Sequence, residues 1–423
     1  MSGLPAAAQA LLLDPSTRDD PALYRRLHAE APVLRTGGFW LVSGHRQVSK
    51  LAGDPRLGID PRAGDPPLPL TQSERLELIF GRMLTFQDGA AHRRLRQLVS
   101  GAFSARRTND LDDTVRGVVA DLVARAAAGG AEFDVVTAIA DRLPVLTTCR
   151  LFDLPAPSWP RVEAWARTLT GQLFRFGQSA DELADVDRQA DEVLTFIDEL
   201  AAERRDRSGD LVAELFAASA GEDAQLSHDE FVSFVLLLFI NGLDTVTAAV
   251  STCVATLLRE PGLAAGLRRE PDRAVDVVDE CLRLASPVWL AARRAVEPIE
   301  SDGQVIAAND PVFLLWAVAN RDPAVFDHPD EFRPGRAGRH LAFGRGPHHC
   351  LGAAMARVQA AEVLRQLAAY EDLRAGSGPA LRRRTTALMT YDSLPVTVTP
   401  TGEPLSTEPL STRAEARLHA TSR

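Results

Sequence analysis

The residues best suited to chemistry lie in a glycine-rich stretch, residues 343–352, which contains a cysteine just before a predicted helix. Backbone N–H groups at the start of a helix stabilise an anionic sulfur, so Cys350 is a candidate thiolate. Gly344, Gly346 and Gly352 carry no side chain and allow a flat ligand to approach the backbone. The pattern predicts a thiolate site for a planar group. The alternative is a turn that holds a buried cysteine.

A second candidate group interrupts an apolar, helix-like stretch at residues 228–259. Asn241, Gly242, Asp244 and Thr245 lie together in otherwise apolar sequence, although glycine costs a helix about 1 kcal/mol relative to alanine. Residues that break local rules in this way often mark a functional site. The alternative is a kinked core helix in which the threonine bonds back to a carbonyl group.

Two further patterns place charges on one helix face. Glu280 and Arg283 are three residues apart, and His92 and Arg96 are four residues apart. Both spacings bring side chains together on a helix. Pairs of this kind are common on protein surfaces, so neither pattern identifies a function by itself.

Helical periodicity dominates the chain, and short β-like segments punctuated by glycine and proline are few. The sequence therefore predicts a mainly α fold with small β-sheets. A Ser-x-x-Glu capping box at Ser227 and Glu230 predicts the start of the longest apolar helix. The expected helices are 21–30, 91–103, 110–128, 159–173, 181–205, 228–259, 271–284 and 351–370, and the expected strands are 33–36, 39–42, 304–306, 311–315 and 394–399.

Composition narrows the function classes. The 423 residues include 47 Lys and Arg against 57 Asp and Glu, a net charge of −10, which argues against nucleic-acid binding. Four separated cysteines without a CxxC pair predict neither a disulfide framework nor a zinc ribbon, and they favour a cytoplasmic location. The apolar run 231–240 is half of the roughly 20 residues that a membrane span needs, so no membrane association is expected.

The stretch 343–352 resembles the haem-binding loop of the cytochrome P450 family, Phe-Gly-x-Gly-x-His-x-Cys-x-Gly, at every fixed position. The resemblance implies haem b (iron protoporphyrin IX) with Cys350 as its thiolate ligand and metal-binding residue. It also implies that Phe343 packs near the sulfur, that His348 bonds a haem propionate, and that the glycines border the haem. A metal site built from His340, His348, His349 and Cys350 is the alternative, but ligands this close together make a poor zinc cage.

Three distant regions carry the same resemblance. The run 241–245 is similar to the family's oxygen-binding helix motif, which implies that Gly242 lies against the haem and that Asp244 and Thr245 relay protons. Asn241 departs from the usual Ala or Gly, and we expect it to orient substrate or water. Further implied roles are haem-propionate contacts for His92, Arg96 and Arg293, and a structural ion network of Glu280, Arg283 and Arg336. The resemblance covers about residues 14–400.

The resemblance implies one large catalytic domain at 14–400, preceded by an N-terminal extension, 1–13, and followed by a tail, 401–423, whose sequence repeat predicts disorder. The implied activity is monooxygenation, the use of O2 to hydroxylate or epoxidise an apolar small molecule of secondary metabolism. Oxidative coupling or cyclisation is an alternative, as is a haem-binding sensor or carrier without catalysis. Asp244 and Thr245 favour oxygen activation, with electrons delivered by a reductase.

Electrons would come from NAD(P)H through a ferredoxin reductase and a ferredoxin, because the chain contains no dinucleotide-binding glycine motif. We expect an acidic ferredoxin to dock near Arg339, Arg345 and Arg357. The alternative is that these arginines only solvate the loop and the helix. Substrate contacts are expected from the segments 70–86 and 170–178 and from a set of mostly apolar side chains, of which Trp289 and Met389 have a plain core role as the alternative. That set is Leu237, Leu238, Asn241, Val288, Trp289, Leu290, Leu388 and Met389.

Overall fold

A computed structural model describes residues 3–102, 105–129, 131–204, 207, 211–219, 225–336, 339–384 and 387–399. The predicted tail, 401–423, lies outside these residues. Contacts between residues divide the chain into two compact units, which we call unit 1 and unit 2. Unit 1 comprises Met1–Gly58, Val115–Leu143 and Asp244–Arg423, and unit 2 comprises Ile59–Thr114 and Pro144–Leu243.

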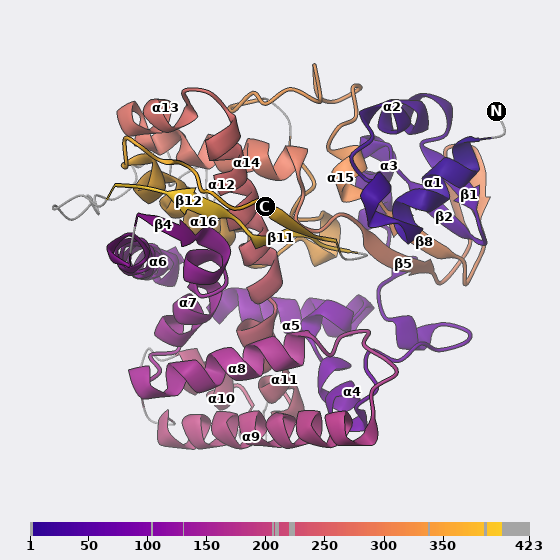
Figure 1. Cartoon of the computed structure of the whole chain (residues 1–423). Helices are drawn as coiled ribbons and strands as arrows, with labels where there is room; N and C mark the ends of the chain where they lie inside the picture. Colours follow the sequence, from indigo (N-terminus) through magenta and orange to yellow (C-terminus); the bar gives the residue numbers. More distant parts are fainter. Residues whose placement is uncertain are drawn as a thin grey trace. The chain divides into compact units, whose positions relative to one another are not determined.

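Unit 1 combines helices with the small sheets (Figure 1). Its helices are α1 (Leu4–Leu13), α2 (Pro21–Glu30), α3 (His45–Ala52), most of α6 (Ala105–Ala128), nearly all of α12 (Leu243–Arg259), α13 (Leu263–Arg269), α14 (Ala274–Leu284), α15 (Trp316–Ala319) and α16 (Ala353–Ala368). Its strands are β1 (Val33–Thr36), β2 (Phe39–Val42), β3 (Leu57–Gly58), β4 (Glu132–Asp134), β5 (Ala291–Ala295), β6 (Ile299–Ser301), β7 (Gln304–Ile306), β8 (Pro311–Leu314), β9 (Arg374–Ala375), β10 (Leu381–Arg384), β11 (Met389–Ser393) and β12 (Pro395–Thr397).

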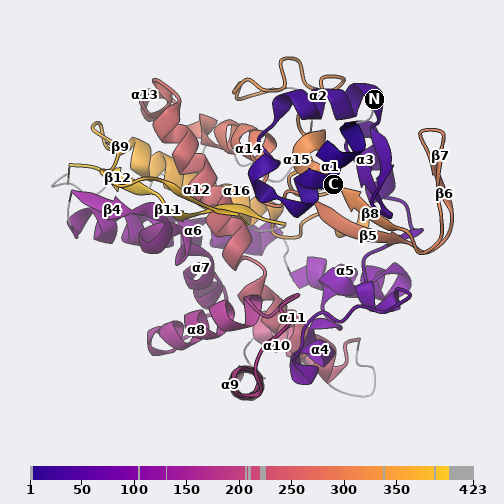
Figure 2. The same cartoon turned by 45° about the vertical axis from the view of Figure 1, so that its right-hand side comes forward.

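The main sheet of unit 1 has the strand order β1-β2-β8-β5-β3. Its first hairpin agrees with the expected strands 33–36 and 39–42, because Gly37 and Gly38 both adopt positive φ (+56° and +86°) and make the tight turn that joins them. β2 and β8 pair in parallel, and the other pairs are antiparallel. The small sheets are β4-β12-β9, β10-β11 and β6-β7, and Figure 2 shows the β6-β7 hairpin extending away from the main sheet.

Unit 2 is helical (Figure 1). Its elements are α4 (Glu74–Phe80), α5 (Gly89–Ala102), nearly all of α7 (Leu143–Leu151), α8 (Trp159–Thr170), α9 (Ala180–Arg204), α10 (Leu211–Ala217) and α11 (His228–Ile240). The capping box that opens α11 is confirmed, because the Ser227 hydroxyl accepts from the Glu230 N–H (3.1 Å) and the Glu230 carboxylate accepts from the Ser227 N–H (2.8 Å).

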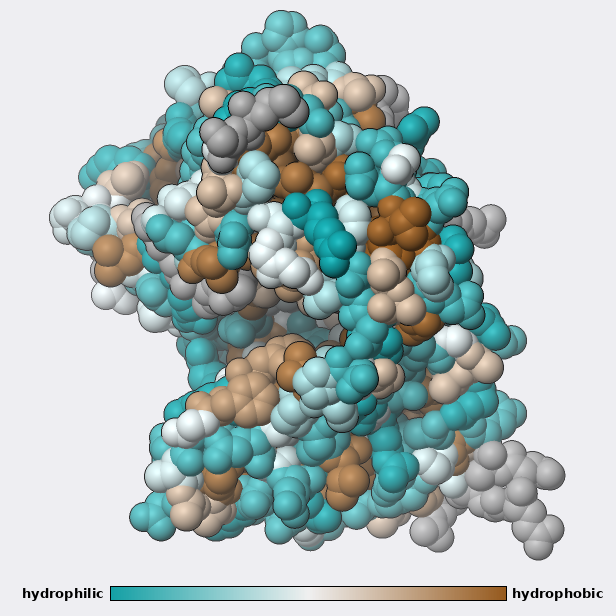
Figure 3. Space-filling view, turned by 90° about the vertical axis from the view of Figure 1, so that its right-hand side faces the viewer, coloured by the Kyte–Doolittle hydropathy of each residue, from teal (hydrophilic) through white to brown (hydrophobic). Residues whose placement is uncertain are grey.

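The expected helix 228–259 is interrupted at Asn241 and Gly242, where α11 ends and α12 is about to begin. Among the described residues, this stretch alone is long and apolar enough to cross a membrane, yet 72% of its most apolar window is buried inside the protein. It is therefore a core element. Hydrophilic residues cover most of the face drawn in Figure 3, and apolar residues form separate small patches there.

The predicted N-terminal extension is a folded element. Residues 4–13 form α1, and Leu4, Leu11 and Leu12 lie in the same hydrophobic cluster as Trp289 and Leu290. α1 packs against α2 and β1, which follow it in the chain, and the same cluster includes the distant residues Trp289 and Leu290. Burying three leucine side chains contributes several kcal/mol to folding, at roughly 1.5–3 kcal/mol for each.

We predict that Leu11→Ala lowers the free energy of unfolding by about 2–5 kcal/mol, because Leu11 is fully buried and its truncation leaves a cavity. Leu13→Ala is the matched control, since the Leu13 side chain is 72% exposed, and a surface change of this kind stays within about 0.5 kcal/mol. Urea denaturation followed by circular dichroism measures both. Equal effects would show that α1 does not belong to the folded core.

Candidate functional site

The cysteine-containing stretch folds as a tight turn in unit 1. The Cys350 N–H donates to the Phe343 carbonyl (2.9 Å), and the Gly344 N–H donates to the Leu341 carbonyl (2.9 Å). Gly346 has φ of +77°, and a Cβ atom there would lie 2.6 Å from the Ala52 carbonyl oxygen. Only glycine fits this position, because any side chain would collide with the backbone at the end of α3.

Cys350 differs from the other three cysteines. Its side chain is exposed, whereas Cys149, Cys253 and Cys281 are buried. α16 begins at Ala353 rather than at the expected residue 351, so Cys350 lies about one turn before the helix. The surroundings fit a haem. The turn presents an exposed soft thiol donor, and a Cβ added at Gly352 would meet no atom within 4 Å.

A largely buried polar network contacts the turn through the Phe343 ring. The Arg357 guanidinium lies 4.3 Å from the centre of the Phe343 ring and bonds the Asp279 carboxylate (2.6 Å), which also pairs with His340 (3.1 Å). Burial raises the pKa of Asp279, but hydrogen bonding to His340 and the charges of His340 and Arg357 outweigh it, and the pKa is lowered overall. The sequence reasoning did not identify Asp279.

The network corrects the expected docking role of Arg357. Its side chain is only 3% exposed and is held between Asp279 and the Phe343 ring, so it is not available to a protein partner. Arg345 and Arg339, the other two arginines expected to contact a ferredoxin, are exposed. An arginine on the second turn of an apolar helix resembles a surface cation in sequence, and only the fold shows that Asp279 faces it.

The structure brings Glu280, Arg283 and Arg336 together. Two nitrogens of Arg283 bond the Glu280 carboxylate (2.7 and 2.9 Å), and the Arg336 Nε donates to the same carboxylate (2.8 Å). The side chains of Glu280 and Arg283 are 3% and 2% exposed. Arg283 also donates to the carbonyls of Asn320 (2.9 Å) and Pro329 (2.7 Å), so the pair ties α14 to the segment that precedes the cysteine turn.

Asp244 and Thr245 occupy the first turn of α12 in unit 1, and both are half-buried. Arg383 of β10 lies 3.7 Å from the Asp244 carboxylate, a contact that the sequence did not reveal. Asn241 caps α11 in unit 2, where its side-chain amide donates to the Thr85 hydroxyl (3.2 Å). Gly242 follows it, and the nearest atom to a Cβ built there would be the Pro144 Cβ at 3.7 Å.

The candidate haem-propionate residues are divided between the units. His92 and Arg96 lie on α5 in unit 2, where His92 is 2% exposed and Arg96 is half-buried. Arg293 lies on β5 in unit 1 and is also half-buried, as is His348 in the cysteine turn. α5 is preceded by Asp88, whose carboxylate accepts from the Ile59 N–H (2.8 Å) and so holds the start of the helix.

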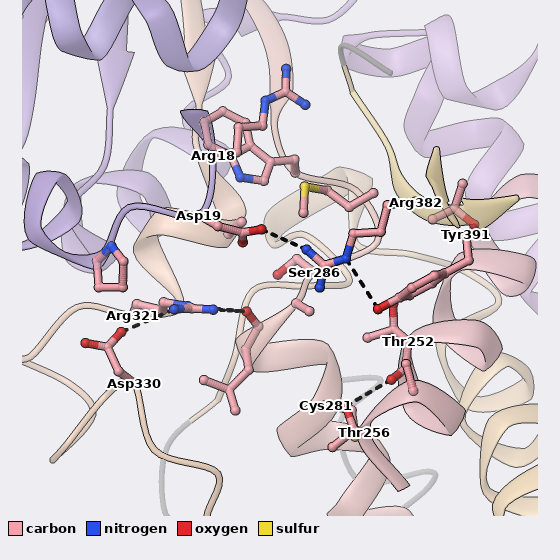
Figure 4. Close-up of a pocket in the computed structure, with 18 of the residues that line it drawn as sticks. Arg18, Asp19, Thr252, Thr256, Cys281, Ser286, Arg321, Asp330, Arg382 and Tyr391 are labelled. Carbon is pink, nitrogen blue, oxygen red and sulfur yellow. Dashed lines mark hydrogen bonds and ion pairs between the residues drawn. The ribbon is translucent and has the colours of Figure 1, made fainter. Parts of the chain in front are cut away.

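Several expected substrate residues surround a pocket of about 530 Å³ in unit 1 (Figure 4). Trp289 is 1% exposed and lies beneath the Arg18 guanidinium at 4.6 Å, which supports its core role. Leu388 forms a bridge with Val288, and Met389 packs against the same core cluster. Of the others, Leu290 is buried in unit 1, and in unit 2 Leu237 is buried and Leu238 half-buried.

The structure does not support the alternative metal site among the residues that it describes. No group of three or more His, Cys, Asp or Glu side chains there is arranged to hold a metal ion. His340 instead pairs with Asp279 behind the turn. A single thiol therefore remains the candidate ligand.

Known proteins are similar to this chain in sequence and in fold. The family model "Cytochrome P450" matches residues 149–367. The biotin biosynthesis cytochrome P450 of Bacillus subtilis is 31% identical over 348 residues, which cover 80% of this chain and 86% of the relative. Mycinamicin IV hydroxylase/epoxidase of Micromonospora griseorubida is 32% identical over 338 residues, 77% of this chain and 81% of the relative.

A solved cytochrome P450 structure is similar to this chain in fold. The crystal structure of P450BioI in complex with an acyl carrier protein ligated to hexadec-9Z-enoic acid superposes with a TM-score of 0.79 at 29% identity. The match covers 90% of this chain and 99% of that chain. The predicted mainly α fold with small sheets is therefore confirmed as a single fold that includes residues of both units.

We predict that Glu280→Ala destabilises the protein by about 3–5 kcal/mol and yields little haem-loaded protein, because it leaves the Arg283 charge buried without its carboxylate. Glu270→Ala is the matched control. It removes an exposed glutamate that pairs with Arg273 at the same spacing, at 4.0 Å, and the loss there is below about 1 kcal/mol. Unfolding curves and the haem-to-protein absorbance ratio measure the two variants, and normal haem loading of Glu280→Ala would contradict the assignment.

We also predict a pH-dependent role for Asp279. Because folding lowers its pKa, the ionised carboxylate stabilises the protein above the unfolded pKa of about 3.9, and this contribution is lost as the pH falls through the folded value. Asp279→Asn should cost about 1–3 kcal/mol at pH 7. The difference from the parent protein should shrink below pH about 4. A difference that stayed constant or grew with acidification, in urea melts across pH, would argue against this network.

Proposed function

This chain belongs to the cytochrome P450 family and is a monooxygenase, and on that premise we propose that it hydroxylates or epoxidises an apolar small molecule, with Cys350 as the ligand of haem iron. The observation that carries the proposal is the exposed Cys350 thiol on a turn that only glycine can form at position 346. The catalytic domain proposed for the chain is 14–400, to which α1 adds its packed leucines.

The haem of this family would be held by residues from several elements. Cys350 would donate its thiolate to the iron, and Phe343 would shield the sulfur from water while Arg357 holds the ring. His92, Arg96, Arg293 and His348 would bond the propionates as cationic or N–H donors. Bound through a thiolate, haem supplies the reductive activation of O2 and the transfer of one oxygen atom to substrate.

Protons would reach that oxygen through the start of α12. The Asp244 side chain is 37% exposed, so its carboxylate can take a proton from solvent. Thr245 follows it directly, and its hydroxyl both accepts and donates hydrogen bonds, which suits the last step of a relay. The reaction balances as R–H + O2 + 2 e⁻ + 2 H⁺ giving R–OH + H2O.

The substrate class proposed is an apolar secondary metabolite or acyl chain. Leu237, Leu238, Val288 and Leu290 offer apolar surface, and Asn241, whose amide donates to the Thr85 hydroxyl, would orient a polar group of the substrate. The names of two relatives, a hydroxylase/epoxidase and a protein crystallised with an acyl-loaded carrier protein, support both reaction types and an acyl substrate.

Electrons would come from NAD(P)H through a ferredoxin reductase and a ferredoxin that contacts exposed Arg345 and Arg339.

The test is turnover under ¹⁸O2 with NADPH, a surrogate ferredoxin and its reductase, using apolar compounds chosen by their shift of the haem spectrum. We expect one labelled oxygen atom in the product. Asp244→Asn should lower product formation on the order of 10²-fold, the lower range for loss of an acid–base group.

Asp229→Asn is the matched control, because Asp229 is an exposed helical aspartate that pairs with Arg82 at 3.2 Å in unit 2. It should retain the parent rate. Product oxygen derived from water, or an Asp244→Asn variant as active as Asp229→Asn, would contradict the proposed function.

A further inference from the structure

One arginine of the C-terminal hairpin lies between two carboxylates. The Arg383 Nε bonds Asp392 on the neighbouring strand β11 at 2.7 Å, and its Nη1 lies 3.7 Å from Asp244 on α12. The side chains of Arg383, Asp244 and Asp392 are 41%, 37% and 51% exposed. All three belong to unit 1.

A third carboxylate acts on the same guanidinium. Burial lowers the pKa of Arg383, but the hydrogen bond to Asp392 and the charges of Asp392, Asp244 and Asp141 raise it overall. Asp141 itself accepts from the Thr247 hydroxyl (3.0 Å), less than one turn after Asp244 on α12. The charge of Arg383 thus interacts with three carboxylates, of which Asp244 lies at the start of α12.

The hairpin that carries Arg383 also carries expected substrate contacts. Arg383 pairs across the hairpin with Thr390, next to Met389. The Met389 N–H donates to the Pro287 carbonyl (2.9 Å), and Leu388 bridges Val288. The backbone of one short element thus joins the acid at the start of α12 to residues expected to contact substrate.

We propose that Arg383 is a positioning residue for oxygen activation, which holds the Asp244 carboxylate in place while Asp392 competes for the same guanidinium. The inference rests on the proposed relay role of Asp244. It assigns the C-terminal hairpin a part in proton delivery. It also predicts that removing the charge of Arg383 and removing the charge of Asp392 change peroxide formation in different directions.

The direction of each variant's effect on H2O2 formation follows from the product to which the electrons are delivered. When protons arrive correctly, two electrons and O2 give R–OH and H2O, and when the relay fails the same electrons give H2O2 by O2 + 2 e⁻ + 2 H⁺. Arg383→Gln releases the carboxylate, so peroxide formed per NADPH should rise about two- to five-fold, the factor that corresponds to an exposed ion pair. Asp392→Asn removes the carboxylate that competes for Arg383, so Asp244 keeps its ion pair with the guanidinium. Peroxide formed per NADPH should therefore stay level or fall.

Arg382→Gln is the matched control. Arg382 is the preceding residue of β10, but its ion pair is with Asp19 (2.7 Å) and its Nε donates to the Tyr391 hydroxyl (3.3 Å), as Figure 4 shows. It should leave the peroxide yield unchanged. Arg383→Lys retains the positive charge but lacks the planar guanidinium. Its peroxide yield should lie between those of the parent protein and Arg383→Gln.

A stability cycle tests the contact without turnover. In the Asp392→Asn background, Arg383→Gln should lower the Tm of the haem-loaded protein. The same substitution should lower the Tm by less when Asp244→Asn is also present. Equal losses in the two backgrounds would show that Arg383 does not hold Asp244.

The remaining outcomes separate this inference from the proposed function. If Asp244→Asn raises peroxide but Arg383→Gln behaves like Arg382→Gln, the positioning role is wrong and the relay stands. If Asp392→Asn raises peroxide as much as Arg383→Gln, the hairpin acts only through its folding, and the positioning role is again wrong. If Asp244→Asn itself has no effect, the relay fails and this inference fails with it.

Discussion

The buried ion pair of Glu280 and Arg283 is the interaction on which the site depends. Arg283 can donate to the carboxylate and to the Asn320 and Pro329 carbonyls at once because its guanidinium has five N–H donors in a fixed plane. The charge lost from water is compensated only when all these partners are present. Helix α14 and the segment before the cysteine turn are therefore joined at a fixed distance.

The cysteine turn is held from two more sides. Gly346 lies against the end of α3, where the Ala52 carbonyl leaves no room for a side chain. Arg357 from α16 contacts Phe343 and is fixed by Asp279, the residue beside Glu280. α14 thus supplies neighbouring carboxylates to two networks, one before the turn and one behind it. Together they hold the turn on which the exposed Cys350 lies.

Local patterns in the sequence predicted the local features of the fold. Gly37-Gly38 between two short apolar segments predicted the first hairpin, and Ser227 and Glu230 predicted the start of α11, because turns and caps depend on residues within a few positions. The stretch 343–352 predicted the tight turn that carries Cys350 for the same reason. The break at Asn241 and Gly242 was visible only as unusual composition, since periodicity does not show how a backbone resolves it.

The features that the sequence did not predict depend on distant partners. Arg357 looked like a surface cation, and its burial follows from Asp279, 78 positions earlier. Arg383 lies in a run of three arginines, and nothing in that run distinguishes the one beside Asp244 from Arg382, which faces Asp19. Residues 1–13 were predicted only as an extension, because the sequence does not show that α1 packs against Trp289 and Leu290 as well as against the nearby α2.

The central claim is that the Cys350 thiolate is the iron ligand of this cytochrome P450. The absorption spectrum of the purified protein, reduced with dithionite under carbon monoxide, tests it most directly. A strongly red-shifted Soret band in the parent, and its replacement by the band of histidine-ligated haem in Cys350→His, is the predicted result. A parent protein that binds no haem, or whose fresh preparation already has the histidine-type band, would contradict the account.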